Sequence, residues 1–330
     1  MVSRAVCAAG PGYGDEGAPV NMLDPLSCPG HWNSATRQAE DIKWHLRVIR
    51  KPWHPACERA ARLCIRPARG DRLGHAVPPI AQQTRCVTET QQETIETPAG
   101  ALVALVTGAN KGIGLETVRR LAGAGYRVYL TARNPGLGQP AAGTVGASFL
   151  QMDVTSDESV RHAAEVVEQA DGHLDVLVNN AGITGPLRDV HEYIADDIAT
   201  ILMTNVVGYV RVIHAFLPLL ERSQDPRIVN VGSGLGSFGL FHDESRIESR
   251  AGTPLYGAAK AAINMLTARY AKLLPGIRIN VADPGMTATD LSGGQGHPVR
   301  DGTDAIIAYA LAAPGSASGT FRDRDGDLPW

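Results

Sequence analysis

The stretch "ALVALVTGANKGIGLETVRRLAGAG" at residues 101–125 decides how this chain folds. Its apolar start has the composition of a short strand buried on both faces of a parallel sheet, and residues 115–123 have the pattern of a helix. The turn between them contains Gly108, Gly112 and Gly114. Glycines at this junction form a tight turn, or they let backbone N–H groups close on a phosphate where the helix begins. The spacing GxxxGxG matches neither the GxGxxG fingerprint nor a Walker loop, so the turn alone leaves both interpretations open.

The remainder of the chain repeats this alternation of strand and helix. Short apolar runs predict strands at 126–132, 147–154, 174–182, 226–233 and 277–285, and a short last strand within 319–330. Stretches with a helical period predict helices at 156–169, which Ser156 would cap, at 196–221 and at 254–274. Strands that alternate with helices form βαβ units. We therefore predict one α/β domain at 100–330, a doubly wound parallel sheet of the Rossmann type.

Residues 1–86 differ from the rest of the chain. They contain all five cysteines, three of the four tryptophans, and 12 Lys and Arg against 7 Asp and Glu, whereas the whole chain carries a net charge of −3. Only 39–51 could form a short amphipathic helix. We predict that residues 1–99 form an extension of low order, or that they precede a natural start near Val87. On either interpretation, the working protein is expected to be complete from about Val87 to Trp330.

The cysteines indicate neither a metal site nor a disulfide framework. Cys57 and Cys64 are separated by six residues, His54 is nearby, and no CxxC pair occurs. A zinc module needs closely paired ligands, and an odd number of cysteines leaves one unpaired. We expect no bound metal.

Composition and charge also narrow the partners. The hydrophobic fraction of 44% and the charged fraction of 20% are typical of a globular protein. A net charge of −3 gives no reason to expect binding to nucleic acid or to an anionic membrane. No apolar stretch approaches the roughly 20 residues that a membrane-spanning helix needs, and the first residues make a poor signal peptide. We expect a cytoplasmic protein.

Further motifs follow the glycine turn in a fixed order. These are "NNAG" at 179–182, Asn205, Ser233 at a strand end, Tyr256 and Lys260 in "YGAAK", and "PG" at 284–285. Their order and their placement on strands and helices resemble the short-chain dehydrogenase/reductase family, over about 101–290 and more loosely to Trp330. Each motif alone is weak evidence for the family; a YxxxK pair, for example, is usually part of an ordinary helix face. The ordered set is specific.

The resemblance implies reduction of a small-molecule carbonyl to an alcohol by hydride transfer. It assigns Tyr256 as general acid and base. Lys260 would hold the nicotinamide ribose and, with the oxidised nicotinamide, lower the pKa of that tyrosine from its usual value of about 10. Ser233 would hydrogen-bond the substrate oxygen, and Asn205 would support a water between Lys260 and solvent. The alternatives are a strand-end turn for Ser233 and a helix kink for Asn205.

The cofactor expected from the sequence is NADPH. Relatives that prefer NAD end the second strand with an acidic residue that binds the ribose hydroxyls, but here "TAR" is followed by no Asp or Glu. Arg133 and Lys111 would instead meet the 2'-phosphate; the alternative is that both are solvated surface charges. The resemblance places the following residues around the cofactor: Gly108, Asn110, Lys111, Gly112, Ile113, Gly114, Arg133, Asp153, Val154, Asn180, Ala181, Gly182, Tyr256, Lys260, Pro284, Gly285 and Thr287.

The segment between Ser233 and Tyr256 is longer than the family's usual gap. A longer segment resembles the carbonyl-reductase-like branch, in which an insertion can obstruct the common assembly interface, so monomer and homodimer both stay open. Phe238, Phe241 and His242 would either wall a substrate pocket or anchor the inserted loop. The glycine-rich stretch 288–302 is expected to be a mobile lid.

The sequence therefore predicts an NADPH-dependent carbonyl reductase. One alternative is an NADP-dependent alcohol dehydrogenase working in the oxidative direction, because the same residues serve both directions. A nucleotide-sensing binding protein without chemistry is disfavoured, since Tyr256 and Lys260 are both present. The identity of the substrate is left open.

Overall fold

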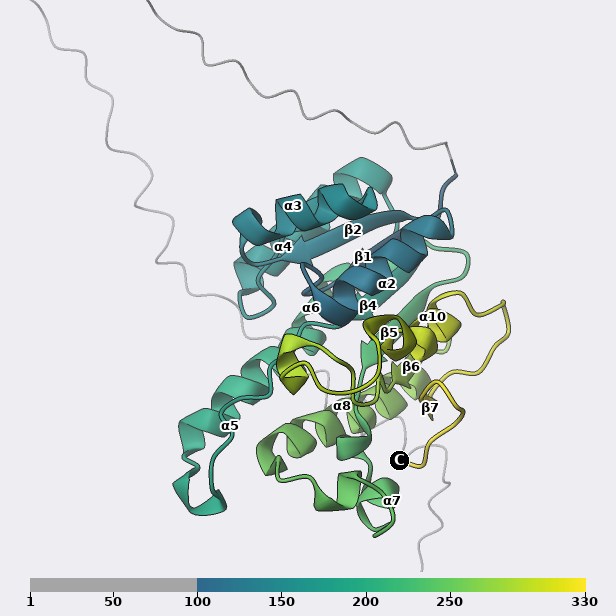
Figure 1. Ribbon diagram of the computed structural model, residues 1–330. Coiled ribbons are helices and arrows are strands. Elements are labelled where there is room, and N and C mark those ends of the chain that lie inside the picture. The colour runs from purple at the N-terminus through teal and green to yellow at the C-terminus, as the bar shows by residue number, and fades with distance from the viewer. Residues whose placement is uncertain (1–99) are drawn as a thin grey trace, which may run out of the picture. The chain divides into compact units, whose positions relative to one another are not determined.

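The structure, a computed structural model, describes residues 100–330 (Figure 1). This is the range in which the sequence predicts the Rossmann-type domain. The predictions for the extension at 1–99, including the helix at 39–51 and the start near Val87, lie outside the described residues.

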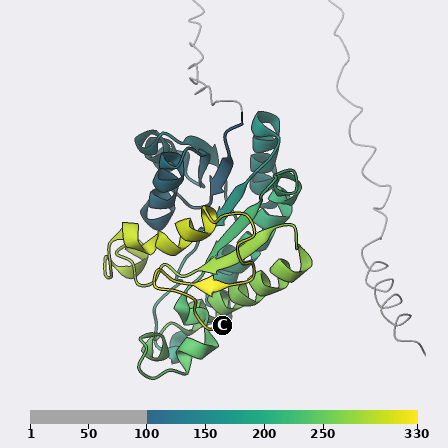
Figure 2. The same ribbon diagram turned by 90° about the vertical axis from the view of Figure 1, so that its right-hand side faces the viewer.

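A seven-stranded sheet forms the centre of the domain (Figures 1 and 2). The strands lie in the order β3-β2-β1-β4-β5-β6-β7, and each neighbouring pair is parallel. The predicted doubly wound parallel sheet is confirmed, and so is the short strand expected near the C-terminus. The bounds are β1 Val103–Val106, β2 Arg127–Ala132, β3 Ser148–Gln151, β4 Val176–Asn179, β5 Arg227–Val231, β6 Arg278–Ala282 and β7 Phe321–Arg322.

Strand β1 shows why its apolar run has no polar interruption. Val103 and Leu105 belong to the hydrophobic core on one face of the sheet, whereas Ala104 and Val106 belong to the core on the other. Successive side chains of a strand point to opposite faces. A strand covered on both faces therefore has to be apolar throughout, and each large aliphatic side chain that it buries contributes about 1.5–3 kcal/mol.

Helices cover both faces of the sheet. Helices α4, α6 and α8 pack on one face, and α2, α3 and α10 on the other. The predicted cap of α4 is confirmed, because the Ser156 hydroxyl accepts a hydrogen bond from the Ser159 backbone N–H at 3.2 Å. The bounds are α2 Gly112–Gly123, α3 Pro135–Val145, α4 Asp157–Asp171, α5 Ala195–Leu202, α6 Gly208–Leu220, α7 Phe238–Phe241, α8 Pro254–Leu273, α9 Val299–Gly302 and α10 Asp304–Ala310.

Four helices, α3, α10 and the short α7 and α9, are absent from the sequence-based prediction. The glycines and prolines of 134–146 are typical of a loop. Here, however, Asn134 caps α3 by accepting a hydrogen bond from the Gly136 N–H at 2.9 Å, and a proline occupies the first helical position. A Cβ at Gly138 would lie 2.1 Å from the Phe149 ring. Glycine therefore lets this helix pack closely on β3.

The long helix predicted at 196–221 is confirmed as α5 and α6 joined by a π-helical turn at Met203–Val207. Its 26 residues, Ala195–Leu220, include an 18-residue window with a mean hydropathy of 1.4, so it is long and apolar enough to pass as a membrane span by length and composition. The expectation that no stretch approaches that length is therefore wrong. Core helices pass the same test, and Val212, Phe216 and Leu220 of α6 are fully buried in the core of this domain.

The strand order places a crevice at one edge of the sheet. Strand β1 lies between β2 and β4, so the chain leaves β1 toward one side of the sheet and later returns to its other side at β4. Ligands of doubly wound folds bind outside the carboxyl ends of the strands where this reversal occurs. The glycine turn follows β1, and the NNAG segment follows β4 at the same edge.

Candidate active site

The glycine turn after β1 is shaped by close contact with its neighbours. Gly108 and Gly112 have φ angles of +61° and +57°, a region that favours glycine. A Cβ at Gly108 would lie 2.8 Å from the Ala181 backbone, and one at Gly114 would lie 2.6 Å from the Asn180 amide nitrogen. The turn therefore excludes side chains at these positions and packs its backbone directly on the NNAG segment.

Hydrogen bonds hold the NNAG segment to the glycine turn. The Thr107 hydroxyl accepts from the backbone N–H groups of Asn180 and Ala181, both at 2.9 Å. The Asn180 side-chain amide donates to the carbonyls of Thr107 at 2.8 Å and Gly108 at 3.1 Å. Asn180 thus stabilises the glycine turn through hydrogen bonds to its backbone carbonyls. Gly182 lies beside Asn205, because a Cβ at Gly182 would lie 3.5 Å from the Asn205 amide oxygen.

The start of α2 lies in the same crevice. Lys111 is its N-cap residue and makes no capping hydrogen bond with its side chain. Asn110, Gly112 and Ile113 are partly exposed around it. The positive end of a helix dipole and its first N–H groups favour an anion, so this corner has the chemistry of a phosphate site.

The ends of β2 and β3 form a second charged corner. Arg133 is exposed directly after β2. Burial by itself would raise the pKa of Asp153, but hydrogen bonds from Thr155 and the charges of Arg133 and Arg211 hold it below its ordinary value. Val154 is buried and packs against Gly208 of α6. Arg133 and Asp153 are thus close enough to interact.

Lys111 has a partner that the sequence does not predict. Its Nζ forms an ion pair with Asp290 at 2.5 Å, and both side chains are largely exposed. Thr289 lies against Gly112, because a Cβ at Gly112 would lie 3.3 Å from the Thr289 methyl group. In the protein by itself Lys111 is therefore directed toward the stretch after β6, whereas Arg133 interacts with Asp153.

Tyr256, Lys260 and Ser233 lie at the carboxyl end of β5. Lys260 is 3% exposed, donates to the Val231 carbonyl at 2.7 Å, and has its Nζ 5.4 Å from the centre of the Tyr256 ring. Their spacing of four residues puts both side chains on the inner face of α8. Ser233 follows β5, and its hydroxyl accepts from the Leu235 N–H at 3.3 Å.

Burial sets the protonation of this pair. It raises the pKa of the Tyr256 phenol well above its usual value, and the charge of Asp283 adds to the effect. It lowers the pKa of the Lys260 ammonium to about 8, against the opposing charge of Asp283. The expected lowering of the tyrosine pKa by Lys260 together with an oxidised nicotinamide concerns the protein with its cofactor bound and stays a prediction. Without that cofactor, burial favours the protonated phenol, and Lys260 is an ammonium below about pH 8.

Asn205 lies fully buried in the π-helical turn between α5 and α6. Its amide oxygen accepts from the Ile183 N–H at 2.9 Å, and its amide nitrogen donates to the Ile183 carbonyl at 2.8 Å. The side chain therefore holds the loop after β4, and its predicted water-mediated link to Lys260 stays a prediction. The predicted helix irregularity is present at this residue, and such π-turns are frequent at functional sites.

The PG turn after β6 is closed by its own side chains. Gly285 has a φ of +61°. The buried Thr287 hydroxyl donates to the Pro284 carbonyl at 2.9 Å, which gives Thr287 a structural role in the turn. Thr289, which the sequence analysis does not name, lies against the glycine turn at Gly112, and the cofactor contact expected of Thr287 stays a prediction. The sequence reasoning also missed Asp283, which precedes the turn and is 6% exposed; an acidic residue at the end of an apolar strand was the available signal.

The stretch expected to be a lid forms a compact loop. The Ser292 hydroxyl donates to the Thr287 and Gln295 carbonyls at 2.7 and 2.8 Å, and His297 pairs with Thr287 in a β-bridge. Together with the ion pair from Lys111 to Asp290, these contacts fold the loop over the glycine turn.

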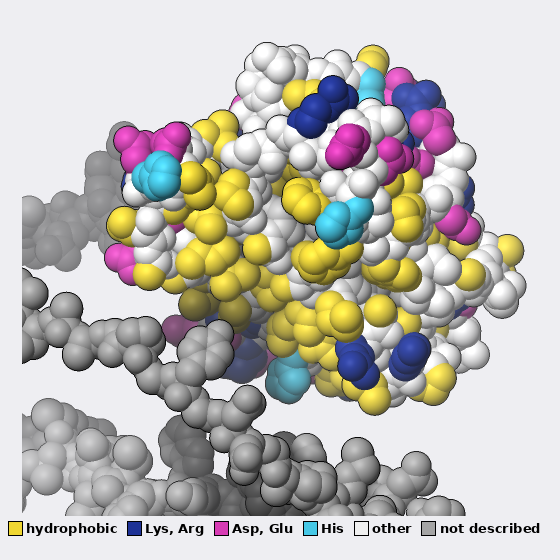
Figure 3. All heavy atoms as spheres, turned by 90° about the horizontal axis from the view of Figure 1, so that it is seen from below, with side chains coloured by type: hydrophobic (Ala, Val, Ile, Leu, Met, Phe, Trp, Pro, Cys, Tyr) yellow, Lys and Arg dark blue, Asp and Glu magenta, His cyan; other side chains and the backbone are white. Residues whose placement is uncertain are grey.

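The inserted segment 234–255 forms an apolar surface beside α8. Phe238 and Phe241 of α7 are 69% and 54% exposed, and His242 packs edge-on against Phe241. The two phenylalanines line a pocket of about 290 Å³, and its lining also includes Pro254 of α8 and Leu235. Leu235 lies in the loop 233–237 after β5, called the serine loop below. Apolar side chains are spread over the face of the domain seen in Figure 3. His242, Ser233 and Tyr256 are not among its lining residues, so a substrate-pocket wall and an anchor for the inserted loop both stay predictions.

The fold and this edge define a dinucleotide-binding α/β domain with a tyrosine–lysine pair and a serine at the carboxyl ends of its strands. The family model of short chain dehydrogenases matches residues 102–298. The chain belongs to the short-chain dehydrogenase/reductase family, which confirms the family predicted from the motifs. Members are oxidoreductases that act on carbonyl or alcohol groups with nicotinamide cofactors.

Known proteins resemble the chain along nearly their whole length. Short-chain dehydrogenase anuI of Penicillium roqueforti (strain FM164) is 36% identical over 239 residues, which cover 68% of this chain and 94% of that protein. The (−)-isopiperitenone reductase of Mentha piperita is 33% identical over 304 residues, covering 68% and 97%. The crystal structure of NADPH-bound carbonyl reductase from chicken fatty liver gives a TM-score of 0.62 at 25% identity, covering 70% and 99%.

The residues of the crevice fit a nicotinamide dinucleotide. The cradle between Gly108, Gly114 and the NNAG segment admits no Cβ, and α2 begins without a capping side chain. Within residues 100–330 no group of His, Cys, Asp and Glu is arranged to hold a metal ion. The site is therefore built around backbone N–H groups, a tyrosine, a lysine and a serine.

Proposed function

We propose that this protein is an NADPH-dependent reductase that converts a ketone or aldehyde of a small molecule into an alcohol. The observation that carries the proposal is the buried Lys260, whose Nζ lies 5.4 Å from the centre of the Tyr256 ring, together with Ser233 directly after β5. This combination offers an acid and a hydrogen-bond donor to one substrate oxygen.

Each side chain has one task in the proposed reduction. The glycine turn and the NNAG segment would hold NADPH, which would supply the hydride for the carbonyl carbon. The Ser233 hydroxyl donates a hydrogen bond to the carbonyl oxygen, and Tyr256 gives its phenolic proton to that oxygen as negative charge develops on it. The Lys260 ammonium stabilises the phenolate that this leaves. Pro284, Gly285 and the NNAG segment would enclose the nicotinamide end.

Two features support NADPH over NADH. Strand β2 ends without an acidic residue, and Arg133 is exposed directly after it. An acidic residue there would bind the ribose hydroxyls, whereas an arginine suits a 2'-phosphate. Lys111 would join Arg133 only by exchanging Asp290 for the phosphate. The chicken relative is a carbonyl reductase described as NADPH-bound, and the peppermint relative is named a reductase.

The proposal is tested with a panel of aldehydes, quinones, keto esters and cyclic ketones, followed by the loss of NADPH absorbance. The matching alcohols with NADP⁺ are measured in parallel for the oxidative direction. We expect at least one carbonyl class to be reduced, with NADPH preferred over NADH. Binding of NADPH without turnover of any carbonyl or alcohol would instead identify a nucleotide-sensing protein.

Reduction should slow as the pH rises above about 8. Burial lowers the pKa of Lys260 to about 8, so the ammonium is present below this pH and is lost above it. The pKa of Tyr256 is raised, so the phenol keeps its proton over the same range. We expect kcat/KM for reduction, measured between pH 6 and 10, to be level below pH 8 and to fall above it. A level profile through pH 9 would contradict this assignment.

A further inference from the structure

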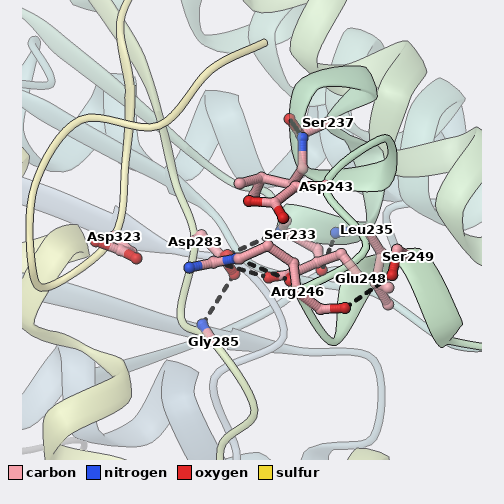
Figure 4. A network of polar contacts seen from close by, with 12 residues as sticks. Ser233, Leu235, Ser237, Asp243, Arg246, Glu248, Ser249, Asp283, Gly285 and Asp323 are labelled. Atoms are coloured by element: carbon pink, nitrogen blue, oxygen red, sulfur yellow. Dashed lines mark hydrogen bonds and ion pairs between the residues drawn. The ribbon is translucent and has the colours of Figure 1, made fainter.

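Asp283 is a buried ionisable residue for which the proposed chemistry has no task. Its Oδ2 accepts a hydrogen bond from the Gly234 N–H at 2.8 Å, and its Oδ1 accepts one from the Gly285 N–H at 2.8 Å. Figure 4 shows this carboxylate between the two backbone turns. Hydrogen bonds to an ionised acceptor are shorter and stronger than neutral ones. One side chain therefore links two loops that come from different strands.

One of the two linked loops carries Ser233, and the other is the PG turn, which is proposed to enclose the nicotinamide end. Gly234 directly follows Ser233, and Gly285 belongs to the PG turn after β6. The backbone ladder between β5 and β6 ends with the hydrogen bond from the Gly232 N–H to the Ala282 carbonyl at 2.8 Å. Beyond this bond the Asp283 carboxylate continues the connection as far as the serine loop.

The surroundings of the Asp283 carboxylate disfavour its charged form. A Cβ at Gly234 would lie 2.7 Å from the Glu248 Oε1 and 3.0 Å from the Asp283 Oδ2, so two acidic side chains converge on this glycine. Arg246 compensates Glu248 with hydrogen bonds at 3.1 and 3.2 Å. Burial raises the pKa of Asp283, and the charges of Glu248 and Asp323 add to that effect. A buried charge beside like charges is costly, and an apolar residue here would avoid that cost.

We propose that Asp283 is a positioning residue that fixes the Ser233 hydroxyl for the carbonyl substrate by strapping the serine loop to the PG turn. The inference rests on the proposed reductase function. The Ser233 hydroxyl is oriented by the Leu235 N–H at 3.3 Å, so a displacement of the backbone at 233–235 displaces the hydroxyl as well. A shift of about 1 Å in a catalytic group can cost on the order of 100-fold in rate.

The test is the Asp283→Asn variant. The amide keeps one acceptor oxygen but turns a nitrogen toward a backbone donor, so one of the two straps is lost with little change in volume. We expect kcat for reduction to fall on the order of 10- to 100-fold, while the dissociation constant for NADPH and the KM for the carbonyl change little. Asp323→Asn is the matched control. It removes a charge from the same cluster, but the Asp323 side chain accepts from Asp325 and Gly326 instead, and it should leave kcat near the wild-type value.

A double-mutant cycle with Ser233→Ala separates positioning from other effects. If Asp283 acts through Ser233, Asp283→Asn should cost much less in the Ser233→Ala background than in the wild type. An equal cost in both backgrounds would overturn the proposal. So would an equal loss in Asp323→Asn, which would indicate a general effect of charge.

Backbone hydrogen exchange keeps the proposal testable if no substrate is found. The Gly234 amide, the Gly285 amide or both should exchange faster in Asp283→Asn than in the wild type and in Asp323→Asn. An absence of turnover by the wild type would defeat the proposed function, whereas unchanged exchange at both Gly234 and Gly285 would overturn the link between the two loops.

Discussion

Tyr256→Phe is expected to lower kcat for carbonyl reduction by about 10²- to 10⁴-fold, the range that a general acid contributes. The substitution removes the phenolic proton and little else, since the ring keeps its place on α8 beside Lys260. The dissociation constant for NADPH should stay close to the wild-type value. Steady-state rates on the best carbonyl of the panel, together with NADPH titration, measure the two effects separately.

Tyr270→Phe is the matched control, because it makes the same chemical change on the same helix. Tyr270 packs against the hydrophobic core far along α8 from the catalytic pair, so its variant should keep wild-type kcat. Retention of more than about a tenth of the wild-type kcat by Tyr256→Phe would contradict the assignment. It would mean that the phenol lowers the activation free energy by about 1.4 kcal/mol or less, which is too little for the general acid.

Arg133→Asp is expected to shift cofactor preference from NADPH toward NADH. Loss of a charge-assisted hydrogen bond to the 2'-phosphate costs about 1.5–3 kcal/mol, which corresponds to about 10- to 150-fold in the dissociation constant. The new carboxylate also repels the phosphate and can accept from the ribose hydroxyls of NADH. The measured quantity is the ratio of the dissociation constants for NADH and NADPH in the variant and in the wild type.

The control for this prediction is Arg161→Asp, an equal change of charge on the exposed surface of α4. It should leave the ratio of the two affinities unchanged, because the distant charge is screened by solvent and salt. An unchanged ratio in Arg133→Asp would mean that this guanidinium is a solvated surface charge and that another residue recognises the phosphate.

Local pattern was sufficient to predict most of the elements. The uninterrupted apolar run of β1, the cap at Ser156 and the helical period of 196–221 each reflect a rule that acts over a few residues. Helix α3 was missed because glycine is a poor helix former on its own and its glycines suit a loop. The cap at Asn134 and the proline after it were local signals for the helix, whereas the glycine at 138 is explained only by the Phe149 ring from another element.

The sequence by itself determined the family, the alternation that builds the parallel sheet, and the set of motifs at its carboxyl edge. These follow from side-chain period and from residue order along the chain. Only the tertiary structure decided which charges meet. It directs Lys111 to Asp290, turns the Asn205 amide to Ile183, and places Asp283 between the serine loop and the PG turn. The physical reason is that a pKa or a hydrogen bond depends on burial and on partners distant in sequence. Such partners leave no periodic pattern in the amino-acid sequence.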